Sequence, residues 1–389
     1  MPDGGGPIAV RVLGRIGDIP AAAWDACAGP ENPFVSHGFL HALEDCGAAT
    51  AETGWRASHL AVEAPDGTVL GVCPLYLKSH SFGEYVFDWA WADAFERAGG
   101  RYYPKLQSCV PFTPVTGPRL MVRPGAPRGE VAGALAAALG ELARRTGVSS
   151  LHVTFAEPGE CETLAGAGFL RRLGHQYHFR NPGYASFEDF LAALTSRKRK
   201  AIRKERAKVA ASGITIRTLT GGAIEPRHWD AFYRFYVATA NRKWGDPYLT
   251  RAFFHRIGET MAERIVLVVA EDRGEPIAGA LNLLGDGVLY GRNWGAVGDY
   301  RFLHFEACYY RAIDFAIAHG LTRVEAGAQG EHKIQRGYLP VETHSAHWIA
   351  EPAFRDAVAR FVDQEARALR REIAALGEDS PFRRDGAKK

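Results

Sequence analysis

Several signatures of common protein classes are absent from this sequence. It has no GxSxG, no phosphate-binding GxxxxGK[ST] loop and no Rossmann GxGxxG fingerprint, so hydrolase, kinase and dehydrogenase functions have no support. The six cysteines are scattered without a CxxC pair, which predicts reduced core thiols rather than disulfides or a zinc site. No apolar run approaches the roughly 18 residues of a membrane-spanning helix. The start, MPDGGGPIAV, lacks a signal-peptide pattern. We expect a cytoplasmic protein without a metal, and peripheral contact with the inner membrane stays open.

The charge is close to balance, but basic residues are concentrated in one segment. The chain of 389 residues carries a net charge of +3, and eight basic residues and one acid lie between Arg197 and Lys208. A helical passage is predicted over residues 187–212, with an apolar inner side. Its basic side could clamp phosphates of a cofactor, a transfer RNA or an anionic lipid surface, and a solvated interdomain helix is an equally good interpretation. The candidate anion-binding residues are Arg197, Lys198, Arg199, Lys200, Arg203 and Lys204.

One layout of residues occurs twice in the chain. RRTGVSSLHVTFAE (144–157) and IAHGLTRVEAGAQ (317–329) both read as a helix end, a glycine, a short turn and a strand. Downstream, Gly168 and Gly337 are each followed by histidines after seven and ten residues. Upstream, VLGVCPLYL (69–77) parallels PIAGALNLL (276–284). Three matches in the same order predict a duplicated α/β unit.

Other segments are read from local patterns. The runs 59–62 and 69–78 around Asp66-Gly67 predict a β-hairpin, and Ser36 is a predicted N-cap. Residues 85–118 are rich in aromatic residues, prolines and glycines, which suits a strand followed by a pocket-lining loop or, equally, an ordinary aromatic core.

The second copy ends in a loop rich in glycine and ionisable residues. The segment LTRVEAGAQGEHKIQRGYLPVETHSAHW (321–348) places three glycines and a set of charged side chains directly after a predicted strand. Such loops at the carboxyl end of a strand are where α/β proteins usually keep their chemistry. The loop is therefore the predicted active-site region, with Glu325, Glu331, His332, Lys333 and Arg336 as its ionisable candidates.

These segments resemble the fold of the GNAT superfamily of N-acyltransferases. The resemblance implies two copies of this fold, with mixed central sheets flanked by helices. More narrowly, SHGFLHALE, YYPKLQSCVPFTPVTGPRL, QYHFRNPGYASFEDFLAALTSRKRKAIRKE and EAGAQGEHKIQRGYLPVETHSAHW resemble a FemAB-like bacterial family of N-acyltransferases labelled peptidoglycan biosynthesis/recognition. Bacterial ceramide synthases, which acylate the amine of a long-chain base, are similar to this group. The resemblance covers nearly the whole chain. It predicts a first domain over 1–183 and a second over 184–389, which opens with the basic helix and ends in a C-terminal helix.

The resemblance also implies site residues. Coenzyme A sites of this fold carry Gln/Arg-x-x-Gly-x-Gly/Ala between a strand and a helix. Here GRNWGAVGDYRFLHFE departs from that pattern but retains Gly295 and Gly298. Glu331 or His332, and next Glu325, would deprotonate the amine, Lys333 would stabilise negative charge or hold a phosphate, and Tyr338 would protonate the thiolate. The predicted residues of the acyl-CoA and acceptor pockets are Arg292, Asn293, Trp294, Gly295, Gly298 and Arg336.

Three functions remain open. The first is transfer of an acyl group from acyl-CoA to an amine on a lipid, such as a sphingoid base, or on a small molecule. The second is transfer from aminoacyl-tRNA to a peptidoglycan precursor. The third is recognition of a cell-wall or anionic ligand without catalysis.

Overall fold

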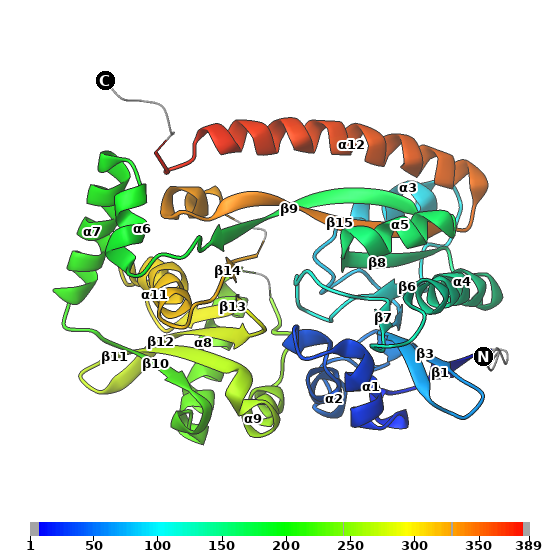
Figure 1. Cartoon of the computed structure of the whole chain (residues 1–389), viewed down its shortest axis with the longest axis horizontal. Helices are drawn as coiled ribbons and strands as arrows, with labels where there is room; N and C mark the ends of the chain where they lie inside the picture. The colour runs from blue at the N-terminus through cyan, green and yellow to red at the C-terminus, as the bar shows by residue number, and fades with distance from the viewer. Residues whose placement is uncertain (1–7, 244, 328–329, 384–389) are drawn as a thin grey trace. The chain divides into compact units, whose positions relative to one another are not determined.

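The chain forms two compact units. A computed structural model describes residues 8–243, 245–327 and 330–383 (Figure 1). Unit 1 comprises residues 1–174 and 342–369, and unit 2 comprises residues 175–341 and 370–389. The chain therefore passes from unit 1 to unit 2, returns to unit 1, and ends in unit 2.

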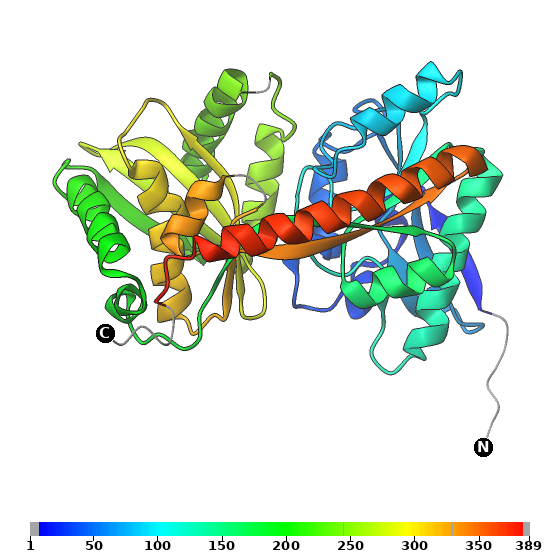
Figure 2. The same ribbon diagram turned by 90° about the horizontal axis from the view of Figure 1, so that it is seen from above.

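Unit 1 contains two sheets and the helices that cover them. One sheet has the strand order β15-β8-β6-β5-β2 within this unit, and the other has the order β1-β3-β4-β7. Its strands are β1 (Ala9–Leu13), β2 (Trp55–Ala57), β3 (His59–Glu63), β4 (Val69–Cys73), β5 (Tyr76–Lys78), β6 (Lys105–Ser108), β7 (Met121–Val122), β8 (Ser150–Ala156) and most of β15 (Leu339–Ile349). Its helices are α1 (Ala21–Ala28), α2 (His37–Asp45), α3 (Trp89–Arg97), α4 (Arg128–Thr146), α5 (Pro158–Gly166) and the start of α12 (Pro352–Glu378; red in Figure 2).

Unit 2 is built on one sheet with the order β10-β11-β12-β13-β14-β9. Its strands are β10 (Thr215–Thr220), β11 (Ile265–Asp272), β12 (Glu275–Leu284), β13 (Val288–Ala296), β14 (Arg323–Glu325) and the end of β9 (Leu170–Arg180). Its helices are α6 (Phe187–Ala193), α7 (Ser196–Ala210), α8 (Pro226–Lys243), α9 (Arg251–Thr260), and a run of α10 (Leu303–Phe305), a π-helical turn (Glu306–Tyr310) and α11 (Arg311–Ala318).

The two units repeat one arrangement of strands. In unit 1, β6 runs parallel to β8 over three residue pairs, and β8 is antiparallel to β15. In unit 2, β13 runs parallel to β14 over three pairs, and β14 is antiparallel to β9. A helix precedes the second parallel strand in each case, α4 before β8 and α11 before β14. The mixed α/β fold with a duplicated unit, predicted from three sequence matches, is confirmed.

The last strand of each copy pairs in the other unit. Strand β9 follows β8 in sequence but pairs with β14, whereas β15 follows β14 and pairs with β8. Residues 342–369 consequently belong to unit 1, so the compact units differ from the contiguous division 1–183 and 184–389 expected from the sequence. The difference arises because strand pairing, rather than chain order, determines which residues pack together.

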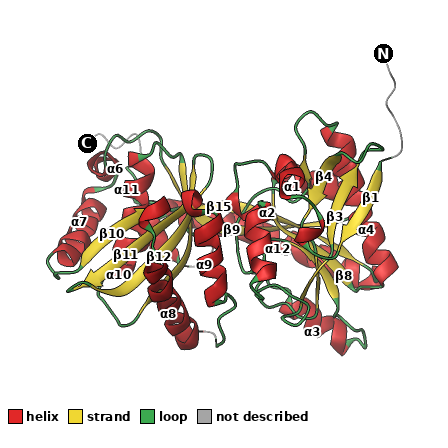
Figure 3. Ribbon diagram, turned by 90° about the horizontal axis from the view of Figure 1, so that it is seen from below, coloured by secondary structure: helices red, strands yellow, loops and turns green. Residues whose placement is uncertain are grey.

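Helices cover both faces of the unit 2 sheet (Figure 3). Ala278, Ala280 and Ala296 face the side of α7, α10 and the π turn, where they join apolar clusters. On the other side, Gly279 and Gly295 lie directly opposite each other in β12 and β13. A Cβ on Gly295 would lie 2.3 Å from the Phe235 carbonyl oxygen of α8. These two glycines therefore let α8 approach the sheet closely.

Several local expectations are confirmed. The Ser36 hydroxyl caps α2 by accepting from Phe39 N, and β3 and β4 form an antiparallel hairpin. The helical passage predicted over residues 187–212 consists of two helices, α6 and α7, separated at residues 194–195. The aromatic-rich segment was interpreted as a strand followed by a pocket-lining loop or, equally, as an ordinary aromatic core, and it contains helix α3 before β6. In the described part of the chain, none of the helices is both long and apolar enough to cross a bilayer.

Candidate active site in unit 2

The loop that follows β14 is fastened by Lys333. This side chain is buried, and its Nζ donates to the carbonyl oxygen of Ala326 and, at 3.3 Å, to that of Gly327. Burial lowers the pKa of the amine to about 8. Lys333 lies in η6, a 3-10 helix (Glu331–Arg336) that forms the end of the loop, whose residues 328 and 329 lie outside the described part. Lys333, which was predicted to be catalytic, thus joins the end of the loop to the backbone at its start.

The His332 side chain lies beside the hydroxyl group of a tyrosine in unit 2. Its Nε2 is 3.0 Å from the hydroxyl oxygen of Tyr309, and its ring is 5.5 Å from the ring of Phe305. Burial lowers the pKa of the imidazole, and the positive charges of Arg336 and Lys333 lower it further. A neutral imidazole results at neutral pH, which is the form that accepts a proton. Glu331 begins η6 and is exposed.

Arg336 is buried and is held in an ion pair with a half-buried carboxylate. Its guanidinium donates to both carboxylate oxygens of Glu205, at 2.8 and 3.0 Å, and stacks on Phe305 with 3.4 Å to the ring centroid. Tyr310 donates to the same carboxylate. Glu205 comes from α7, so this contact joins the basic helix to the active-site loop. The geometry gives Arg336 an anchoring position, and its predicted role in lining a cofactor pocket stays a prediction.

Two other predicted catalytic residues are buried in specific contacts. Tyr338 has no exposed surface, and its hydroxyl donates to the carbonyl oxygen of Tyr309 at 3.1 Å. Burial raises the pKa of that hydroxyl well above its usual value. Glu325 lies 3.0 Å from Arg323 and 3.7 Å from His178 of β9. Both placements are those of residues that stabilise the core and the sheet.

The predicted cofactor segment borders a cavity. Strand β13 continues to Ala296, although its parallel pairs with β14 end at Tyr290. A cavity of about 370 Å³ lies at the far end of β13 and includes the predicted residues Trp294 and Gly298. Its other lining residues are Thr239, Arg242, Ala296, Asp299, Tyr300 and His304.

The remaining predicted cofactor residues lie next to this segment. Arg292 is the extra residue of a β-bulge, because Asn293 pairs with Leu281 whereas Gly291 pairs with Asn282. The positive charge of Arg292 contributes to the lowered pKa of Lys333, which links the bulge to the loop. Gly295 instead faces α8, where the lack of a Cβ serves packing.

The basic residues of α7 are largely at the surface. Arg197, Lys200, Arg203 and Lys204 are exposed, and Lys198 and Arg199 are half-buried. Arg203 pairs with Glu188, and Arg199 donates to the Leu194 carbonyl at 3.4 Å. This leaves a positively charged face on α7, and its use in anion binding stays a prediction.

Sequence reasoning missed three residues of this region. Tyr309 is a buried core residue, and its hydroxyl contacts His332. His304 lines the cavity and lies 6.1 Å from His332 between ring centroids. Glu205 was counted only as the single acid of the basic segment. That isolated acid was the one signal that the sequence offered.

Comparisons with known proteins agree with this fold. The model of the FemAB-like family, described as peptidoglycan biosynthesis/recognition, matches residues 15–384. Among solved structures, FemX has a TM-score of 0.54 at 13% identity and covers 88% of this chain and 98% of its own. L-PGS from Bacillus licheniformis has a TM-score of 0.50 at 11% identity, with coverages of 86% and 98%. At these identities the likeness concerns the fold alone. No curated protein matches the chain in sequence.

Proposed function

The chain belongs to the FemAB-like family, and from this premise we propose that it is an N-acyltransferase. It would transfer an acyl group from an acyl-CoA thioester to a primary amine, with a long-chain amino-lipid as one class of acceptor. The observation that carries this proposal is the joint placement, in unit 2, of a cavity at the end of β13 and a neutral histidine on the loop after β14.

The cavity supports a donor site. Strand β13 carries a β-bulge and continues beyond its parallel pairing, so its last residues are available to contact an extended ligand. Trp294 and Tyr300 supply apolar surface there, and Gly298 allows close approach of the backbone. Arg242 reaches the same cavity and supplies a positive charge for a phosphate.

The loop supports proton transfer. His332 would accept a proton from the attacking ammonium group, and the free amine would then attack the thioester carbonyl carbon. The C–N bond forms as the C–S bond breaks, the acylated nitrogen then loses its second proton to the medium, and the thiolate leaves with the proton that His332 accepted. Tyr309 orients the imidazole, and Lys333 holds the loop in place. Tyr338 has no part in this scheme, since its hydroxyl is buried and already donates to a carbonyl.

Native mass spectrometry with short and long acyl-CoAs tests the donor, and thiol release after addition of amines tests the transfer. We expect saturable binding of an acyl-CoA and amine-dependent thiol release. Absence of both would reject the proposal.

Transfer from aminoacyl-tRNA to a peptidoglycan precursor is the second candidate. The family description and the exposed basic face of α7 favour it. Charged transfer RNA should then bind in a salt-dependent manner, and replacement of Lys200 and Lys204 by glutamate should weaken binding at least tenfold. Binding of a precursor without turnover of either donor would instead indicate a recognition protein.

A further inference from the structure

One face of the unit 1 sheet is polar where a core would be expected. Trp55, Lys78 and Lys105 lie side by side on β2, β5 and β6. Two residues along the strands, a second row runs through Tyr76, Gln107, His152 and His347 on β5, β6, β8 and β15. Side chains two residues apart on a strand share a face, so both rows lie on the same side of the sheet. Each of these seven side chains is buried.

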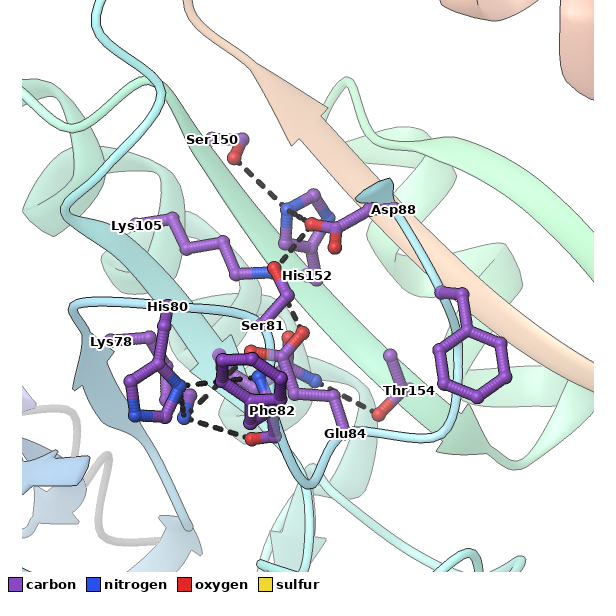
Figure 4. Close-up of polar contacts among 12 residues, drawn as sticks. Lys78, His80, Ser81, Phe82, Glu84, Asp88, Lys105, Ser150, His152 and Thr154 are labelled. Atoms are coloured by element: carbon purple, nitrogen blue, oxygen red, sulfur yellow. Dashed lines mark hydrogen bonds and ion pairs between the residues drawn. The ribbon is translucent and has the colours of Figure 1, made fainter. Parts of the chain in front are cut away.

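A loop covers this face and is anchored through one lysine. Residues 79–88 form no helix or strand, and three of their side chains turn inward to Lys105. The Lys105 Nζ donates to Ser81 Oγ and to Glu84 Oε2, both at 2.7 Å, and to Asp88 Oδ2 (Figure 4). Phe82 and Phe87 of the same loop are 52% and 56% exposed. The loop is therefore all that separates the polar face from solvent on this side.

Oxygen atoms in this cluster are buried without a hydrogen-bond partner. They include Glu84 Oε1, Asp88 Oδ1 and Gln107 Oε1, whose residues are all at most 3% exposed. These three atoms are acceptors, and buried acceptors are normally satisfied by a donor. Glu84 Oε1 lies 4.0 Å from the Lys78 Nζ, which already donates to Phe82 O at 3.2 Å. The cluster therefore has acceptor capacity that its own side chains do not use.

The charge of the cluster changes sign near neutral pH. Burial lowers the pKa of Lys78 to about 7, and burial raises the pKa of Glu84 to about 7. Burial opposes the charge of Lys105, but Glu84 and Asp88 outweigh it and raise its pKa. Burial likewise opposes the charge of Asp88, but Lys105 lowers its pKa well below the usual value.

Burial favours the neutral form of the other titratable groups that face the cluster. Burial lowers the pKa of His152 to about 3 and also lowers those of His347 and His80. It raises the pKa of Tyr102, Tyr103 and Cys109. The net charge of the two lysines and two carboxyls therefore goes from about +1 at pH 6 to about −1 at pH 8.

We propose that this covered face of unit 1 is a second binding site, which takes the ammonium group of a primary amine onto the unpartnered oxygens of Glu84, Asp88 and Gln107. An ammonium group presents three N–H donors and one positive charge, and so matches three acceptors in a cluster whose net charge is about −1 at pH 8. The inference rests on the proposed function, because it identifies unit 1 as a place where the amine substrate is held.

The test uses methylammonium as the probe and tetramethylammonium as a cation of the same charge without N–H donors. Binding to the full-length protein is measured by calorimetry at pH 6 and pH 8 in the absence of acyl donor. Hydrogen exchange of residues 79–88 reports whether the covered face responds. Glu84→Gln removes the negative charge with little change in shape, and Asp93→Asn removes an exposed charge from nearby α3 as the matched control.

We expect saturable methylammonium binding that is at least tenfold tighter at pH 8 than at pH 6 and slows exchange of the loop. Glu84→Gln should weaken it at least tenfold, and Asp93→Asn should leave it unchanged. Equal binding by Glu84→Gln, equal binding of tetramethylammonium, or no saturable methylammonium binding would each overturn the inference. The wild-type comparison of the two cations and two pH values needs no variant to fold. Acyl-CoA binding and thiol release are measured separately, so failure here leaves the proposed function testable.

Discussion

The two units share a strand arrangement but distribute their polar groups differently. In unit 1, Lys105 is completely buried and satisfies three side chains of one loop. In unit 2, the His332 side chain is exposed although Lys333 and Arg336 of the same turn are buried, and a cavity opens at the end of β13. Residues at equivalent strand positions also differ. In unit 1, His152 of β8 contacts His347 of β15 at 2.7 Å, whereas in unit 2 Glu325 of β14 is 3.7 Å from His178 of β9. The two copies thus share the same strand pairing, but the polar side chains of unit 1 are more deeply buried than those of unit 2.

Replacing the central lysine of unit 1 should have the largest effect on stability. Lys105→Met leaves Glu84 and Asp88 buried without their cation, which should cost about 3–5 kcal/mol. Arg336→Met in unit 2 should cost about 1–2 kcal/mol, because solvent can reach its partner Glu205. Urea unfolding with hydrogen exchange of β6 and β15 compares the variants. A larger effect for Arg336→Met would contradict the contrast in burial.

Replacing the candidate base should affect turnover and leave the fold intact. His332→Ala should lower amine-dependent thiol release about 100-fold or more, the usual contribution of a general base. Acyl-CoA binding by native mass spectrometry should persist. His319→Ala, which removes another histidine of unit 2 stacked on Phe315, is the matched control and should retain activity. Full activity of His332→Ala would exclude it as the base.

Adding a methyl group at two sheet glycines distinguishes rigid from adaptable packing. In unit 2, Gly295→Ala places a Cβ 2.3 Å from the Phe235 carbonyl oxygen and should cost about 1–3 kcal/mol. In unit 1, Gly71→Ala meets the buried Val131 side chain at 2.5 Å and a backbone atom, the Met121 carbonyl oxygen, only at 3.1 Å, so its cost should be smaller. Gly133→Ala in α4 meets nothing within 4 Å and should stabilise by about 0.5–1 kcal/mol. Thermal unfolding measures all three, and equal losses at Gly295 and Gly71 would refute the distinction.

A pH dependence of stability is assigned to Lys78. Its pKa is about 7 in the folded protein and near 10.5 in the unfolded chain, so above pH 7 the unfolded state binds more protons. Stability of the wild type relative to Lys78→Met should therefore rise with pH from 7 to 8.5, by about 1 kcal/mol per pH unit. Lys333→Met should show the same trend, displaced upward, because its pKa is about 8. Stability differences that do not vary with pH would show that both amines stay charged.

Much of the fold could be predicted because its signals are local. The hairpin of β3 and β4 follows from Asp66-Gly67 between alternating strands, and the Ser36 cap lies next to the helix that it begins. Helix α3 was missed because Trp89, Trp91 and Phe95 read equally well as pocket or core residues. The duplication was visible because its three matches keep their order along the chain.

Candidate site residues were predictable only as a group. The loop 330–337 was identified by its composition, and the structure brings His332, Lys333 and Arg336 into one region of unit 2. Their individual environments could not be read from the sequence, since Arg336 is defined by Glu205, which is 131 residues away. The polar face of unit 1 was not detected at all. Its parts come from β2, β5, β6, β8 and β15, and each looks like an isolated polar residue in a strand.

By itself, the sequence determined the element types, the duplicated order of those elements and the basic character of α7, because periodicity, caps and charge runs act over a few residues. Only the tertiary structure decided with which copy the last strand of each copy pairs, and which charged groups are buried. Strand exchange depends on pairing between segments far apart in the chain, as when β15 joins β8 and sets His347 against His152. Whether Lys78 or Lys333 carries a charge at neutral pH depends on burial, which no local pattern specifies.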